Sequence, residues 1–120
     1  MRMKDKVVLV TGGATGIGKA TALRFAEEGA RVAICDVNIA LGQETVKLLG
    51  EAAMFHPVNV ANREEVQHWV GQVVARHGRI DVLINNAGVL RDSQLVKFKD
   101  GQVTGQMSEL DFDLVIAVNL

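Results

Sequence analysis

Three glycines with the spacing Gly12-x-x-x-Gly16-x-Gly18 lie between an apolar run and a helix-forming pattern near the amino terminus. Gly12 permits a tight turn, Gly16 has no Cβ and lets a phosphate approach the backbone, and Gly18 lets a helix lie close to a strand. The free N–H groups at the start of that helix favour an anion. The stretch is therefore predicted to hold a nucleotide phosphate, and a plain tight turn is the alternative.

An acidic side chain, Asp36, ends the second apolar run, roughly 20 residues past the glycine stretch. A carboxylate at this place accepts hydrogen bonds from a ribose diol and repels a 2′-phosphate. No arginine or lysine lies in Val37-Asn38-Ile39, where a 2′-phosphate would need one. Asp36 thus predicts NAD(H) in preference to NADP(H). The alternative is a residue that only caps a turn or a helix.

Polar residues also follow the third and fourth apolar runs, as Asn59-Val60 and as Asn85-Asn86-Ala87-Gly88. Ligands of open α/β sheets bind at the carboxyl ends of the strands, so both stretches are candidates for the same site. We expect an adenine ring to rest against Val60 with Asn59 near its amino group; a strand-to-helix turn is the alternative. The two amides and Gly88 can hold a turn rigid and let the backbone pass close to a ligand.

Alternating apolar runs and helical patterns define the architecture that positions these residues. Because each crossover contains a helix, they predict an α/β fold, a doubly wound parallel Rossmann sheet with strand order 3-2-1-4. Pro57 cannot donate to a ladder, which agrees with an edge position for the third strand. The predicted strands are Val7–Val10, Val32–Cys35, Ala53–Val58 and Ile80–Ile84; the predicted helices are Ile17–Glu28, one capped by Asn38 that runs to Leu49, and one capped by Asn62 that runs to His77.

The helix after Asn62 has the clearest amphipathic pattern in the chain. Trp69 belongs to its apolar stripe and is expected in the core, whereas His68 is expected in solvent. Asn62 and Glu65 have the spacing of a capping box. The three histidines show no metal-ligand spacing, and no metal is assigned.

The segment around 94–106 contains Asp100-Gly101 between two extended runs, a strong hairpin signal. We expect a small β-hairpin there, either as a substrate-side lid or subunit contact or as a surface decoration. Ser108 and Asp111 have the spacing of a helix start, and Leu114, Val115 and Val118 would form the apolar face of that helix. The fourth strand would then have no neighbour on its outer side.

Composition restricts the class of protein. The chain has 120 residues, of which 48% are hydrophobic, and a net charge of −1, which suits one domain with an apolar core. No basic patch indicates a nucleic-acid partner, and no apolar run approaches the roughly 20 residues of a membrane span. The polar first six residues do not suit a secretory signal, and the single cysteine, Cys35, forms no internal disulfide, so a cytoplasmic location is expected.

These motifs together resemble the short-chain dehydrogenase/reductases of the classical type, over nearly the whole chain. The likeness is strongest to 3-oxoacyl-acyl-carrier-protein reductases and related dehydrogenases. Members of that group mostly use NADPH and carry a basic residue in the glycine loop or after strand two; Ala14-Thr15 and Asp36 depart from this pattern and favour NAD. The matching motifs are Thr11-Gly12-x-x-x-Gly16-Ile17-Gly18, Asp36, Asn59-Val60, Asn85-Asn86-Ala87-Gly88 and Asn119-Leu120.

The resemblance implies hydride transfer between nicotinamide C4 and a small-molecule carbonyl or secondary alcohol. The catalytic set of the family is Asn, Ser, Tyr and Lys, and only Asn119 has a counterpart here, because the chain contains no tyrosine. Residues 1–120 are therefore interpreted as the N-terminal dinucleotide-binding part of a single Rossmann domain. By itself this part is expected to be inactive, and the parent enzyme is expected to be a homotetramer.

Two other functions are weighed against this one. A dinucleotide-binding module without catalysis would also lack the tyrosine. A methyltransferase that uses S-adenosylmethionine also has a glycine loop and an acid after strand two, but Gly16-Ile17-Gly18 and Asn85–Gly88 argue against it. The candidate cofactor-binding residues are Gly12, Ala14, Thr15, Gly16, Ile17, Gly18, Asp36, Asn59, Val60, Asn86, Ala87 and Gly88, and the candidate catalytic residue is Asn119.

Overall fold

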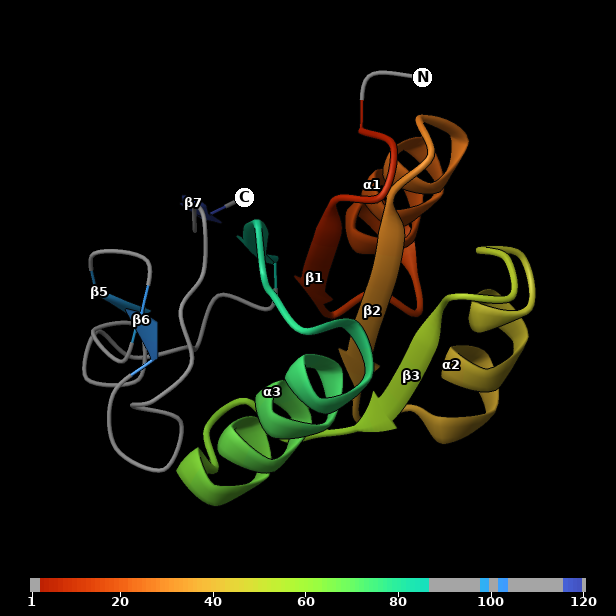
Figure 1. The fold of residues 1–120 in the computed structure, drawn as a ribbon. Coiled ribbons are helices and arrows are strands. Elements are labelled where there is room, and N and C mark those ends of the chain that lie inside the picture. The colour runs from red at the N-terminus through yellow and green to blue at the C-terminus, as the bar shows by residue number, and fades with distance from the viewer. Residues whose placement is uncertain (1–2, 87–97, 100–101, 104–115, 120) are drawn as a thin grey trace.

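A five-stranded sheet with strand order β3-β2-β1-β4-β7 forms the centre of the protein (Figure 1). The computed structural model describes residues 3–86, 98–99, 102–103 and 116–119. The elements are β1 (Val7–Thr11), α1 (Gly16–Glu27), β2 (Arg31–Asp36), α2 (Ile39–Val46), β3 (Met54–Pro57), α3 (Arg63–His77), β4 (Val82–Asn85), β5 (Phe98–Lys99), β6 (Gln102–Val103) and β7 (Ile116–Asn119).

Parallel pairing aligns the carboxyl ends of the three strands that carry the candidate motifs. Thr11 of β1 lies opposite Cys35 of β2 and Asn85 of β4 in the two registers. The turn after β1, Asp36 and Asn86 therefore lie together where the carboxyl ends of these strands meet. The predicted order 3-2-1-4 is confirmed, and so is the edge position of the strand that contains Pro57.

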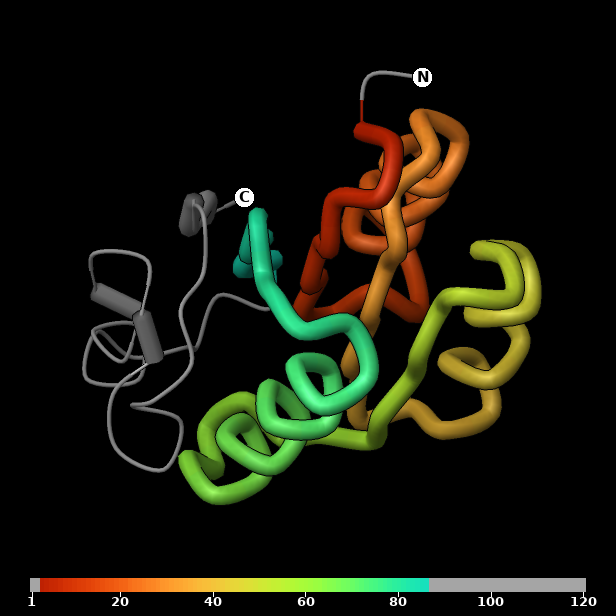
Figure 2. Tube along the Cα trace, in the orientation of Figure 1, coloured from red at the N-terminus to blue at the C-terminus, as the bar shows by residue number. Residues whose placement is uncertain are grey.

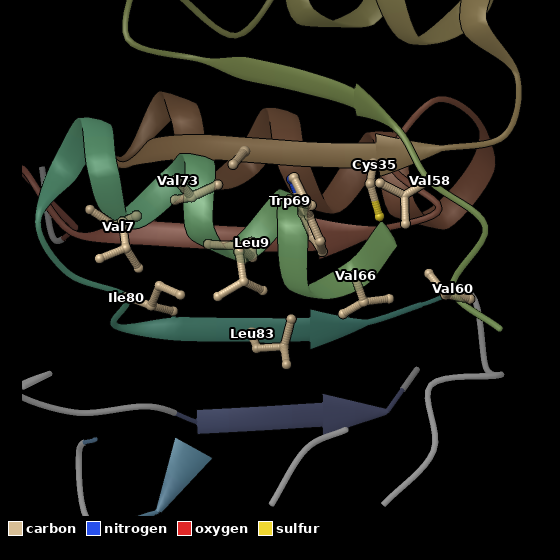
Figure 3. Packing of buried hydrophobic residues seen from close by; sticks show 13 residues of the cluster. Val7, Leu9, Cys35, Val58, Val60, Val66, Trp69, Val73, Ile80 and Leu83 are labelled. Carbon is tan, nitrogen blue, oxygen red and sulfur yellow. The ribbon is translucent and has the colours of Figure 1, made fainter. Parts of the chain in front are cut away.

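Alternate residues of β1 pack on opposite faces of the sheet, as expected for a strand buried on both sides. Leu9 belongs to the cluster with α3, where Trp69 is fully buried as predicted (Figure 3). Val10 belongs to the second cluster, with Ala22 of α1 and partly buried side chains of α1 and α2. The crossover helices thus cover both faces, which defines the doubly wound arrangement.

Helix α2 is shorter than the sequence predicts, since it ends at Val46 and not at Leu49. The N–H groups of Leu48 and Leu49 donate to the carbonyls of Thr45 and Val46, at 2.9 and 3.1 Å. These bonds reach back three residues, so the chain tightens into a turn after the helix. The turn leaves Leu48 59% exposed and buries Leu49 to 6% exposure, and core packing therefore overrides the helical pattern.

The prediction for the last residues of the chain is wrong at 116–119, because these residues form β7 and not a helix. Strand β7 pairs with β4 in parallel, with Ile116 opposite Val82, so β4 has a neighbour on its outer side. A short apolar run fits a helix or a buried strand equally well by periodicity, and the strand is favoured because it pairs the backbone on the outer side of β4. Residues 104–115, which contain the rest of the predicted helix, lie outside the described residues.

The predicted hairpin is confirmed by its two strands. Strands β5 and β6 pair antiparallel, with Phe98 opposite Val103 and Lys99 opposite Gln102. Asp100 and Gly101, which connect them, lie outside the described residues. The role of the hairpin as a lid, a subunit contact or a decoration stays a prediction.

Asp81 joins the beginning of β1 to the beginning of β4. Its Oδ2 accepts a hydrogen bond from the Val7 N–H (2.8 Å), its Oδ1 accepts from the Arg79 guanidinium, and its own N–H donates to Val7 O (2.9 Å). The side chain is almost completely buried. Asp81 therefore fixes the register of the two central strands at the end opposite the candidate site.

Asp81→Ala is expected to lower the free energy of unfolding by about 2 kcal/mol, because the Val7 N–H loses its buried acceptor. Urea denaturation of the variant and the unchanged protein measures the difference. Glu27→Ala is the control, since the exposed Glu27–Arg24 ion pair contributes less than about 0.5 kcal/mol. Equal stability of the Asp81 variant and the unchanged protein would contradict this role.

Candidate nucleotide-binding site

The glycine turn connects the carboxyl end of β1 to the start of α1, as the tube in Figure 2 shows. Gly12 and Gly16 have positive φ angles of 64° and 57°, a backbone region that glycine enters without steric cost. A Cβ built on Gly16 would have no heavy atom within 4 Å, so this side of the turn is open. The predicted tight turn and the open approach at Gly16 are both present.

Close packing surrounds the other two glycines of the turn region. A Cβ on Gly18 would lie 2.0 Å from Gly12 O and 2.6 Å from Asn86 Nδ2, so only glycine fits where α1 crosses the turn. A Cβ on Gly13 would lie 2.6 Å from side-chain atoms of Ile34 in β2. Gly13 is not among the predicted site residues, although its place beside Gly12 is a signal for a role in the turn.

The two strands beside β1 hold the turn region by hydrogen bonds. The Gly13 N–H donates to Cys35 O of β2 (3.1 Å), and Asn86 Nδ2, after β4, donates to Gly12 O (3.2 Å). Within the buried sheet edge, Thr11 Oγ1 donates to Asn85 Oδ1 (3.1 Å). Asn86 therefore holds the turn itself, and Asn85, the last residue of β4, holds the end of β1 from which the turn starts.

Asp36 is half-buried and lies directly against the glycine turn. Its Oδ2 accepts a hydrogen bond from the Ala14 N–H (3.1 Å), and its Oδ1 accepts from the Asn38 N–H (3.0 Å). The second bond shows that Asp36 also caps the turn into α2, the alternative weighed for it. A carboxylate has about four acceptor positions, so it can accept further hydrogen bonds from a ligand.

The start of α1 is suited to an anion. Thr15 is its N-cap and makes no side-chain cap hydrogen bond, and the first turn of the helix holds no acidic residue. Thr15, Gly16 and Ile17 are exposed, and Ile17 keeps 67% of its surface in solvent despite its size. The helix end therefore offers N–H donors to an anion. The Ile17 side chain lines a separate hollow along α1, together with Met3 and Phe25.

Asn59 and Val60 build the strand-to-helix turn that was the alternative for them. Asn59 is exposed, its Oδ1 accepts from the Ala61 N–H (3.0 Å), and its N–H donates to Glu65 Oε1 (2.9 Å). Val60 is only 6% exposed and packs in the cluster with α3. Asn62 caps α3 through the Glu65 N–H (3.1 Å), but Glu65 bonds Asn59 and not Asn62, so the predicted capping box forms only in half.

Two candidate residues, Ala87 and Gly88, lie outside the described residues. Asn119 is the last residue of β7 and lies opposite Asn85 in the register, which places its backbone at the sheet edge that carries the turn. Candidate residues far apart in sequence, from Gly12 to Asn119, thus lie along the carboxyl ends of β1, β2, β4 and β7.

Burial determines the chemistry of Cys35, which lies under the turn. Removal from water raises the pKa of its thiol to about 12, against the weaker opposing effect of a hydrogen bond with the Gly12 backbone. The thiol is therefore protonated at neutral pH and does not serve as a nucleophile.

In the part of the chain that the structure describes, no group of three or more His, Cys, Asp or Glu is placed to hold a metal ion. No described helix is long and apolar enough to cross a membrane.

The parallel sheet, its strand order and the glycine turn define a Rossmann-like α/β protein. The family model described as short chain dehydrogenase matches residues 6–120. The chain belongs to the short-chain dehydrogenase/reductase family.

Relatives and a solved structure support the same family. The chain is 44% identical to the 3-oxoacyl-[acyl-carrier-protein] reductase FabG of Thermotoga maritima, covering 100% of this chain and 46% of that protein. It is 40% identical to short-chain dehydrogenase reductase 3c of Arabidopsis thaliana, covering 100% and 44%. The crystal structure of a short chain dehydrogenase from Bacillus anthracis matches with a TM-score of 0.68 at 39% identity, covering 72% of this chain and 36% of that chain. The chain thus spans about half the length of these relatives.

Proposed function

We propose that the protein is the cofactor-binding part of an oxidoreductase that transfers a hydride between NAD(H) and a small-molecule carbonyl or secondary alcohol. The observation that carries the proposal is the contact between Asp36 Oδ2 and the Ala14 N–H, 3.1 Å apart. It places one carboxylate beside the turn that has the open approach at Gly16. Family membership supports the reaction type, and Asp36 supports the choice of cofactor.

The residues at the sheet edge fit a dinucleotide in two places. The diphosphate would lie on the turn and the start of α1, where Gly16 leaves space and no acidic side chain of the first helical turn opposes an anion. The adenosine ribose would donate its hydroxyls to Asp36, whereas the 2′-phosphate of NADP(H) would meet the same negative charge. NAD is therefore the proposed cofactor.

When bound, NAD(H) supplies or accepts the hydride; the residues of this chain bind and orient it. The chain has no tyrosine to act as the general acid and base of the family, and Asn119 is the proposed catalytic residue in these 120 residues. By themselves these 120 residues are proposed to be inactive.

The parent enzyme is proposed to be a cytoplasmic homotetramer, because of the resemblance to short-chain dehydrogenase/reductases. A dinucleotide-binding module without catalysis is the second candidate, favoured by the missing tyrosine.

Calorimetric titration of the purified protein with NADH, NADPH and S-adenosylmethionine tests the proposal. We expect NADH to bind and S-adenosylmethionine not to bind. We expect NADPH to bind at least ~10-fold more weakly than NADH, because a like-charge contact costs at least the ~1.4 kcal/mol that a factor of ten represents. Selective binding of S-adenosylmethionine would overturn the assignment as a dehydrogenase. Tighter binding of NADPH than of NADH would overturn the role given to Asp36. Hydride transfer by residues 1–120 alone, measured at 340 nm, would contradict the expected inactivity.

A further inference from the structure

The peptide groups around Ala14 are held from two elements. The Ala14 N–H donates to Asp36 Oδ2 at the end of β2, and Thr45 Oγ1 of α2 donates to Ala14 O, at 3.0 Å. Ala14 is 2% exposed and Thr45 is 1% exposed, so water does not compete with the bond from the Thr45 hydroxyl. Thr45 is 31 residues away from Ala14 in sequence and belongs to none of the motifs.

The position of α2 depends on a second residue of the same helix, Gly42. A Cβ on Gly42 would lie 2.2 Å from the nearest ring atom of Phe55 in β3, so α2 lies directly against this ring. Asn38 caps the start of the helix by accepting from the Leu41 N–H (3.0 Å). The short helix is therefore fixed at its start and along the side that packs on β3, and this placement delivers the Thr45 hydroxyl to the glycine turn.

The bond from Thr45 determines the direction of the next N–H group. In a trans peptide the carbonyl and the following N–H point in opposite directions, so a carbonyl of Ala14 directed at Thr45 aims the Thr15 N–H away from α2. Thr15 is exposed and is the N-cap of α1. The hydroxyl of a buried residue thus orients a donor on the outer side of the turn.

We propose that Thr45 is a positioning residue for the dinucleotide, which acts through the Ala14 carbonyl to hold the Thr15 N–H toward the diphosphate. The inference rests on the proposed function, because the diphosphate of NAD(H) is the group that this donor meets. It predicts that Thr45 matters for ligands with a diphosphate and not for adenosine, whose proposed contact is the Asp36 carboxylate.

Two variants separate the hydroxyl from the shape of the side chain. Thr45→Val keeps the shape and removes the donor, whereas Thr45→Ser keeps the donor. Dissociation constants for NADH, ADP-ribose and adenosine are measured on the purified protein by titration and competition. For Thr45→Val we expect NADH and ADP-ribose to bind about three- to tenfold more weakly, the range of one hydrogen bond, with adenosine unchanged. For Thr45→Ser we expect all three ligands to stay within about twofold of the unchanged protein.

The ratio of ADP-ribose affinity to adenosine affinity is the decisive readout. A purely structural role would weaken the site for both ligands and leave this ratio unchanged, and that result would overturn the inference. Unchanged binding of ADP-ribose to Thr45→Val would overturn it too. In both cases the unchanged protein still binds NADH and the proposed function stands, whereas failure of the unchanged protein to bind NADH removes the proposed function itself.

Discussion

Asp36→Asn is expected to weaken NADH binding between about 10- and 100-fold, since a hydrogen bond to a charged group contributes more than one to a neutral group. The same variant no longer repels a 2′-phosphate, so the preference for NADH over NADPH is expected to fall by at least as large a factor. Titration of the variant with both cofactors gives the two dissociation constants. Their ratio is the informative quantity, because it is independent of how much protein is folded.

The matched control for this prediction is Glu27→Gln. It removes the same charge from an exposed side chain in the last turn of α1, whereas the glycine turn precedes the start of that helix. We expect it to change the ratio less than about twofold, because exposed charges are screened by salt. Equal shifts in the two variants would assign the effect to net charge, and an unchanged ratio in Asp36→Asn would remove Asp36 from cofactor selection.

Gly18→Ala is expected to lower the free energy of unfolding by about 3 kcal/mol, the upper range for overpacking. The new Cβ would lie 2.0 Å from Gly12 O, a backbone atom that Asn86 holds in place and that cannot move aside cheaply. The same displacement is expected to weaken NADH binding at least ~10-fold, because the start of α1 shifts away from the turn. Urea denaturation and cofactor titration of the same preparation measure both effects.

Gly16→Ala is the control that separates a clash from backbone strain. Its Cβ would meet no atom within 4 Å, but its φ of 57° remains unfavourable for alanine. This strain costs about 1 to 2 kcal/mol, less than the clash at Gly18. If Gly18→Ala were as stable as the unchanged protein, the close approach of α1 to the turn would not be required.

Local patterns in the sequence were sufficient for the order of the first four strands and for the placement of Asp36 and Asn86 beside the glycine turn. Apolar β-branched runs, glycine spacing and Pro57 each restrict the backbone within a few residues, and a parallel α/β sheet leaves few topologies open. The positions of Asp36 and Asn86 beside the turn follow from this topology, because the strands that carry them end at the same edge. The burial of Trp69 and the two strands of the hairpin were predictable for the same local reasons.

Contacts between residues distant in sequence determined the features that local patterns did not predict correctly or did not predict at all. Residues 116–119 form a strand because they pair with the outer side of β4, and α2 ends early because Leu49 enters the core. The contact between Thr45 and Ala14 has no signal in either stretch, since it depends on where Gly42 lets α2 pack. Such contacts are determined by packing between whole elements, in which one methyl group or one hydroxyl group changes which arrangement has the lowest free energy.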